Sequence, residues 1–136
     1  QAAGAAPLVL GHDVENPETV ATAIRIGKPA SGSKALAARD DSNGLISSVT
    51  DEQILDAQAF LAAKEGIFVE PASAAGVAGL LALKQSGDLP AGQRIVITVT
   101  GNGLKDIDTA LSRTELSTEA VEPSTDRVAA LLGLHQ

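Results

Sequence analysis

Two short stretches place side chains capable of chemistry at the expected carboxyl ends of β-strands. The apolar, β-branched run 95–100 ends in the hydroxyl of Thr100 and is followed at once by a Gly-Asn-Gly turn. The stretch 67–70 (IFVE) ends in the carboxylate of Glu70, and Ser73 follows at the start of a predicted helix. In open α/β sheets, ligands bind beyond the carboxyl ends of the strands. The two stretches therefore suggest a ligand site, where glycines allow the backbone a close approach.

Each of these signals also has a purely structural interpretation. Asn102-Gly103 is a common turn pair. Glu70 precedes Pro71 and suits a helix entry, while the Ser73 hydroxyl can satisfy a free N–H group in the first helical turn. The glycine spacing fits neither the dinucleotide fingerprint nor the phosphate-binding P-loop. The residue types alone therefore leave a ligand site and a tight structural turn both open.

The composition argues against several classes of function. The chain has 136 residues, with 17 acidic and 10 scattered basic residues and a net charge of −7. Nucleic acids and anionic membranes require clustered Lys or Arg, so neither is an expected partner. There is no Cys, and His12 and His135 are too far apart to suggest a metal motif. We therefore expect no metal site and no nucleophile–base pair.

Strand-like and helix-like patterns alternate along the chain, which predicts an α/β fold with a parallel sheet. The most strand-like segment, 94–100, has a continuous rather than an alternating pattern, as expected of a strand buried on both faces. Thr50 and Gln53 have the spacing of a capping box at a helix start. The other strands are expected at 6–10, 45–50, 67–70 and near Glu119–Glu122. Helices are expected from about 17 to a stop at 27, before 44, from 50 to a stop at 66, from 71 to about 85, and at the C-terminal end.

Several features lead us to expect a C-terminal fragment of a larger protein. The chain begins at Gln1, contains no Met, and has two Phe as its only aromatic residues. The predicted helix 71–85 is apolar nearly all round, as expected of a helix buried on every side, and needs more chain to cover it. No leader peptide and no apolar stretch long enough to span a bilayer are visible, so a cytoplasmic protein is expected.

Three stretches resemble segments that occur in the same order in threonine synthases. They are ATAIRIGKPAS (21–31), VEPASAAGVAGL (69–80) and ITVTGNGLKD (97–106), and the opening QAAGAAP resembles the family's segment just after its phosphate-binding loop. Threonine synthases are pyridoxal-phosphate (PLP) enzymes of the tryptophan-synthase-β fold type, fold type II. The resemblance covers nearly the whole chain and is weakest after about Ala110. It implies that 1–136 is the C-terminal portion of the catalytic large domain, with the N-terminal half missing.

The resemblance also implies a set of cofactor-binding residues. Thr100 stands at the position whose hydroxyl hydrogen-bonds the pyridine nitrogen of PLP, where a neutral group modulates the electron sink. Glu70 and Ser73 would lie on the loop beside the ring. Ala23 and Ile24 would pass near its other edge, mostly through their backbone.

The family's Schiff-base lysine and glycine-rich phosphate loop lie upstream, so no catalytic residue is expected in this chain. Lys105 follows Thr100 closely but has no neighbouring phosphate loop, and we interpret it as a solvated lysine. The sequence departs from the family pattern at Lys28 and Gly32, where relatives often carry Asn and an aromatic residue. The role of that loop is therefore left open.

The resemblance implies an enzyme that converts O-phospho-L-homoserine and water to L-threonine and phosphate. The fragment alone would be inactive, and the complete enzyme is expected to be a homodimer. A second hypothesis keeps the cofactor but changes the reaction, to a threonine dehydratase or a β-replacement synthase. A third is a non-catalytic α/β domain that binds a small ligand or a partner.

Overall fold

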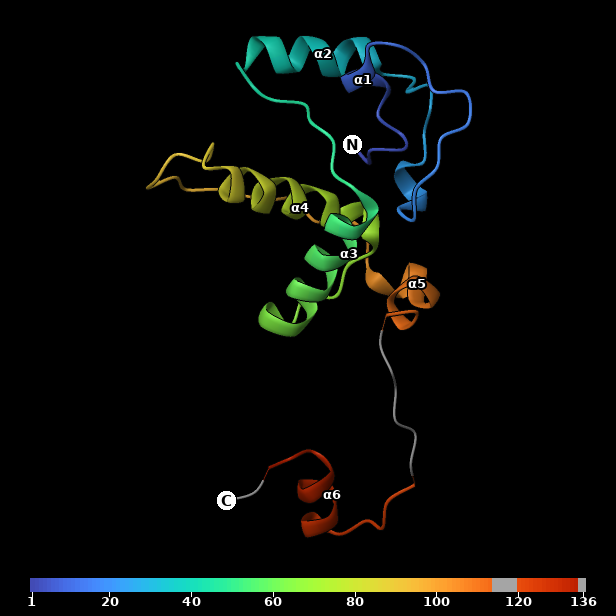
Figure 1. The fold of residues 1–136 in the computed structure, drawn as a ribbon, viewed down its shortest axis with the longest axis vertical. Helices are drawn as coiled ribbons and strands as arrows, with labels where there is room; N and C mark the ends of the chain where they lie inside the picture. Colours follow the sequence, from blue (N-terminus) through green and yellow to red (C-terminus); the bar gives the residue numbers. More distant parts are fainter. Residues whose placement is uncertain (114–119, 135–136) are drawn as a thin grey trace.

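The computed structural model describes residues 1–113 and 120–134, which form helices joined by long extended segments (Figure 1). Within these residues, β structure is limited to isolated bridges, Ala2 with Ala5, Ala2 with Val49 and Val69 with Asn102. The expected parallel sheet is therefore not assembled by the described residues. The helical elements in chain order are α1 (Pro7–Leu10), the 3-10 turn Thr22–Ile24, α2 (Gly32–Asp41), α3 (Asp51–Phe60), the π-helical turn Leu61–Glu65, α4 (Pro71–Ser86), the 3-10 turn Gly103–Asp106, α5 (Ile107–Leu111) and α6 (Thr125–Leu131).

The start of α3 is fixed by the predicted capping box. The Thr50 hydroxyl accepts a hydrogen bond from the Gln53 N–H at 3.2 Å, and the Gln53 side chain accepts one from the Thr50 N–H at 2.9 Å. These reciprocal bonds satisfy two backbone donors that an uncapped helix would leave free. At the other end the helix passes into the π-helical turn, and Gly66 closes it with a positive φ of 66°.

The face of α3 that packs against α4 includes one polar residue. The buried positions follow the i, i+3, i+4, i+7 spacing of one helix face, at Ile54, Ala57, Gln58 and Leu61. Three further apolar residues of this segment, Leu55, Ala59 and Ala62, line a pocket together with residues of α5. The polar Gln58 can be buried on this face because its side-chain amide has a hydrogen-bond partner, which is described below.

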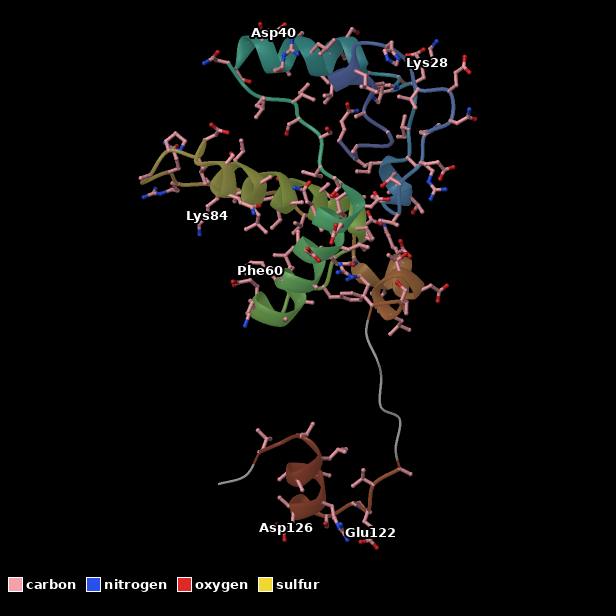
Figure 2. All side chains as sticks on the ribbon, viewed as in Figure 1. Lys28, Asp40, Phe60, Lys84, Glu122 and Asp126 are labelled. Carbon is pink, nitrogen blue, oxygen red and sulfur yellow. The ribbon has the colours of Figure 1, made fainter. Side chains whose placement is uncertain are left out.

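The small-residue helix α4 has the predicted bounds to within about one residue. Pro71 occupies its first turn, where the missing N–H costs nothing, and Gly87 ends it with a φ of 85°. Its buried face consists of small side chains, Ala74, Val77 and Ala78. The expected burial on every side is not seen in the described residues, since Leu81 is exposed and Lys84 points away from the body of the protein (Figure 2).

Two predicted elements near the N-terminal end were wrong. The stretch predicted as a strand at 6–10 is the single helical turn α1, because Pro7 has a φ suited to a helix start and Gly11 closes the turn with a φ of 77°. The helix predicted over 17–27 is reduced to the turn Thr22–Ile24. Its backbone instead bonds to distant partners, since Glu18 donates to the Gly4 carbonyl at 3.0 Å.

The strand-like segments are extended, but within the described residues they pair only through isolated bridges or not at all. Val49 pairs with the start of the chain, accepting from the Ala3 N–H at 2.8 Å. The backbone of residues 93–100 has no hydrogen bond to any described residue. One side of this segment, Ile97 and Val99, packs against the core, while Val96 is 89% exposed. The other strand expected near Glu119–Glu122 lies partly outside the described residues, and the final helix, α6, is confirmed.

No helix among residues 1–113 and 120–134 combines the length and apolar character needed to cross a membrane. The same residues contain no group of His, Cys, Asp or Glu side chains arranged to hold a metal ion.

Candidate functional site

The Gly-Asn-Gly turn lies directly against the segment that leads into α4. Val69 and Asn102 form an antiparallel bridge. On either side of it, the Glu70 N–H donates to the Gly101 carbonyl at 3.0 Å and the Gly103 N–H donates to the Phe68 carbonyl at 3.1 Å. The structure therefore brings together the two stretches that the sequence singled out, although they lie about thirty residues apart in the chain.

Ser73 joins this turn to the first turn of α4. Its side chain is buried, and its Oγ accepts a hydrogen bond from the Gly101 N–H at 2.7 Å. Its own N–H donates to the Glu70 carbonyl at 3.0 Å, in the first turn of the helix. The hydroxyl thus satisfies a backbone N–H group, but one that belongs to the turn after Thr100 and not to its own helix. Both the Glu70 N–H and the Ser73 hydroxyl hold Gly101 in place.

The two glycines of the turn are required by close packing. A Cβ atom on Gly101 would overlap the carboxylate of Glu70, and a Cβ on Gly103 would overlap the ring of Phe68. Neither glycine has a positive φ. A Cβ at either position would therefore force the neighbouring side chain to move, and neither glycine serves a left-handed conformation.

Thr100 is the last residue of the extended segment before the turn. Its side chain is exposed and makes no hydrogen bond to another described residue. The preceding Val99 packs against the core, and the following Gly101 is buried and held from two sides. The Thr100 backbone is thus anchored through its neighbours while its hydroxyl remains available to a ligand.

Ala23 and Ile24 lie in a separate turn that reaches the same helix. The 3-10 turn Thr22–Ile24 contacts α4, and Ile24 packs against the core cluster to which Ala72 and Ala75 also belong as partners. Ala23 is exposed. Both turns with predicted cofactor-wall residues are therefore attached to α4. Lys105 lies beyond them and is exposed, as expected of a solvated lysine.

The sequence analysis did not identify Gln58, a residue of α3 that holds the segment before α4 in place. This side chain is 5% exposed, and its Nε2 donates to the Val69 carbonyl at 2.8 Å. The bond ties α3 to the segment that pairs with the glycine turn. A polar residue on the i+4 position of Ile54 was the available signal, since a buried amide is retained only where it has a hydrogen-bond partner.

Comparison with known proteins agrees with this arrangement. The family model described as "Pyridoxal-phosphate dependent enzyme" matches residues 1–101. The chain belongs to the pyridoxal-phosphate dependent enzyme family. The match covers the α3–α4 core, the Thr22–Ile24 turn and the extended segment up to Gly101. These elements are therefore part of the fold of this family.

Within this family, the chain is similar to several curated threonine synthases. It is 52% identical over 134 residues to that of Synechocystis sp., covering 98% of this chain and 35% of the relative. It is 59% identical over 111 residues to that of Mycobacterium leprae, covering 82% and 31%. The threonine synthase of Bacillus sp. is 47% identical over 128 residues, with coverages of 94% and 36%. The chain spans about a third of the length of these relatives.

The family resemblance inferred from the sequence segments is thereby confirmed. Among solved structures, the T.th. threonine deaminase aligns with 70% of this chain and 38% of its own, at 22% identity and a TM-score of 0.49. This likeness is too weak to add to the family match.

We predict that replacing Ser73 by Ala destabilises the protein. The change removes the acceptor of the buried Gly101 N–H, and an unpaired buried donor costs about 1–3 kcal/mol. The free energy of unfolding of the intact protein, measured in urea, should fall by about this amount. Ser86→Ala, at the exposed end of the same helix, is the control and should change it by less than about 0.5 kcal/mol. Equal effects of the two changes would contradict this role of Ser73.

We also predict that Gly101 and Glu70 are energetically coupled. Gly101→Ala places a methyl group on the Glu70 carboxylate, and such overpacking costs about 1–3 kcal/mol. The Gly101→Ala/Glu70→Ala double variant should lose less free energy of unfolding than the sum of the two single changes, by about 0.5 kcal/mol or more. Gly101→Ala combined with Glu65→Ala should be additive, because Glu65 is exposed and in another element. Additivity in both pairs would show that Glu70 does not fill the space beside Gly101.

Proposed function

We propose that residues 1–136 form the C-terminal portion of a threonine synthase, which converts O-phospho-L-homoserine and water to L-threonine and phosphate. The observation that carries this proposal is identity of 47–59% to three threonine synthases over 82–98% of this chain. The N-terminal part, with the lysine that binds the cofactor and the phosphate loop, then belongs to the longer protein. The chain on its own is inactive under this proposal.

Within that enzyme, Thr100 is the residue of this chain that contacts PLP, by a hydrogen bond to its pyridine nitrogen. Support comes from its exposed hydroxyl without a described partner and from the anchored backbone on both sides of it. PLP supplies an electron sink that stabilises negative charge on the substrate carbon. A neutral hydroxyl at the ring nitrogen tunes that sink without holding a proton on the nitrogen.

The other wall residues have different roles in this proposal. Glu70 and Ser73 flank the loop that carries Thr100, and Ser73 acts by holding the backbone of that loop. Ala23 and Ile24 present their turn along another edge of the cofactor. This assignment makes α4 the common support of the cofactor wall, since both turns contact or bond to it.

The parallel sheet is also part of the proposal. The segment 93–100 is extended and largely apolar, and its backbone groups have no hydrogen-bond partner among the described residues. An unpaired strand presents its backbone in this way. A groove of about 450 Å³ lies between it, the extended segment around Val49 and α4. Most residues that line this groove are apolar, and Gln1 and Ser47 are the polar ones. Strands supplied by the longer protein complete the sheet on these edges.

A homodimer in the cytoplasm completes the proposal, with a small-molecule substrate. The acidic net charge of −7 without basic clusters supports the absence of nucleic-acid and anionic-membrane partners. Each of these statements concerns the complete enzyme.

The experiment that tests the function is reduction of the intact protein with borohydride, followed by peptide mapping. The pyridoxyl label should appear on a lysine outside residues 1–136, and the protein should release phosphate from O-phospho-L-homoserine. A label on Lys105 contradicts the assignment of the cofactor lysine to the part of the protein outside residues 1–136. Phosphate release without any label contradicts the use of PLP.

We predict that Thr100→Val in the intact enzyme lowers kcat/KM for O-phospho-L-homoserine by roughly two- to tenfold. The loss corresponds to one neutral hydrogen bond, about 0.5–1.5 kcal/mol. Thr100→Ser keeps the hydroxyl and should retain most of the activity. The matched control is Thr98→Val, which removes an exposed hydroxyl two residues earlier on the same segment and should leave kcat/KM unchanged. Equal losses at both positions would show a general effect of the segment, and no loss at Thr100 would remove it from the site.

A further inference from the structure

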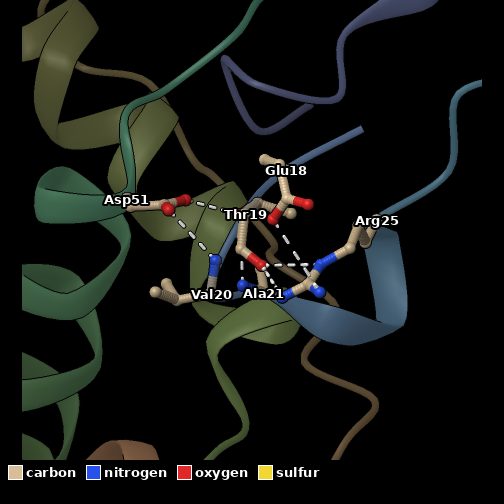
Figure 3. A network of polar contacts seen from close by, with 6 residues as sticks. All are labelled: Glu18, Thr19, Val20, Ala21, Arg25 and Asp51. Atoms are coloured by element: carbon tan, nitrogen blue, oxygen red, sulfur yellow. Dashed lines mark hydrogen bonds and ion pairs between the residues drawn. The ribbon is translucent and has the colours of Figure 1, made fainter. Parts of the chain in front are cut away.

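A polar network holds the loop 18–25 to the start of α3 (Figure 3). The Asp51 carboxylate accepts a hydrogen bond from the Thr19 hydroxyl at 2.5 Å through Oδ1 and one from the Val20 N–H at 3.0 Å through Oδ2. The Thr19 Oγ1 in turn accepts from the Ala21 N–H at 3.1 Å. Thr19 is only 4% exposed, so these bonds lie within the fold. Both carboxylate oxygens of Asp51 are therefore used to hold a loop about thirty residues away in the chain.

The same loop is closed on its other side by Arg25. Its Nε and Nη2 donate to the Thr19 carbonyl at 3.0 Å and 2.6 Å, and its Nη1 lies 3.9 Å from Glu18 Oε2. The guanidinium thus bonds back onto its own loop. Thr19 consequently receives or makes bonds at its hydroxyl and its carbonyl, and the turn Thr22–Ile24 lies between the two tethers.

Helix capping does not account for Asp51. Thr50 and Gln53 already satisfy the helix start through the capping box. The Asp51 carboxylate also sits in the first turn, where the helix dipole favours a negative charge, but its hydrogen bonds go to the loop. Helix stability and loop anchoring are thus divided between two adjacent residues. This division makes it possible to change one without the other.

The anchored turn faces the part of the protein that carries the proposed cofactor wall. Ala21, at the start of the turn, is fully buried, and Ile24 packs on the core cluster together with Val99. The turn contacts α4, whose Ser73 holds Gly101 after Thr100. If the loop 18–25 moved away from α3, it would therefore carry Ala23 and Ile24 away from α4.

We propose that Thr19 and Asp51 are positioning residues that fix the backbone of Ala23 and Ile24 against α4 and so shape one edge of the cofactor site. They act through the turn and do not touch the cofactor. This inference rests on the proposed function, because it assumes that the turn borders PLP.

The test compares Thr19→Val, Thr19→Ser and Thr50→Ala in the intact protein. Valine preserves the buried shape of Thr19 but removes the hydroxyl that Asp51 and the Ala21 N–H bind. The affinity for PLP is measured by absorbance titration of the protein freed of cofactor with hydroxylamine, and stability by urea unfolding. Thr19→Val should raise the dissociation constant of PLP about tenfold, a factor that equals about 1.4 kcal/mol. Thr19→Ser should restore it to near the unchanged value.

Thr50→Ala supplies the matched control, because it weakens the start of α3 without touching the loop. It should lower the urea midpoint and leave the PLP dissociation constant unchanged. The proposal is overturned if Thr19→Val leaves PLP affinity unchanged, if Thr50→Ala weakens it as much, or if Thr19→Ser fails to restore it. If the unchanged protein itself binds no PLP, the proposed function fails, and this inference fails with it before any variant is compared.

Discussion

The arrangement of this protein depends on the contact between two backbones, that of residues 101–103 and that of residues 68–70. The side chains of Glu70 and Phe68 lie over the glycine turn and occupy the space that a Cβ atom on Gly101 or Gly103 would take. The contact aligns the Glu70 N–H with the Gly101 carbonyl and places the Ser73 hydroxyl on the Gly101 N–H. The exposed position of Thr100 and the position of the first turn of α4 follow from this single approach.

Small side chains extend the same principle into the core. Ala57 on α3 and Ala74 and Ala78 on α4 are buried where the two helices meet, and Ile54 is one of the few large side chains that are fully enclosed. Small residues allow elements to approach closely, but each buries little apolar area, and the stabilisation by burial is roughly proportional to that area. Side-chain hydrogen bonds between separate elements therefore contribute more to fixing their positions, as those of Gln58 and Asp51 do.

The elements that could be predicted from the sequence are those whose signals are local. The capping box at Thr50 and Pro71 at the start of α4 gave correct helix starts, because these residues act within one turn of their own positions. The predicted helix over 17–27 failed for the opposite reason. Thr19 and Val20 within it form hydrogen bonds with Asp51, a distant residue that no local sequence pattern predicts as their partner.

The strands and the candidate site were predicted only in part. The run 95–100 was recognised as an extended segment, but strand pairing requires neighbours that the described residues do not provide. The sequence suggested a ligand site at the ends of the two stretches. The structure brings Glu70, Ser73 and the glycine turn together, through an antiparallel bridge and not at the edge of a parallel sheet. Gln58 was missed because its bond to the Val69 carbonyl joins residues whose proximity arises only after α3 has packed.

The bonds around the glycine turn also bear on how the protein ages chemically. An Asn-Gly pair is prone to deamidation, because the glycine nitrogen can attack the asparagine side-chain carbonyl and form a succinimide ring. Here the Gly103 N–H donates to the Phe68 carbonyl, and the Asn102 Oδ1 accepts from the Leu104 N–H at 2.9 Å. Both reacting groups are held in other bonds, and closing the ring would break the contact with Phe68. The fold therefore protects this asparagine from spontaneous conversion to an acid beside the turn.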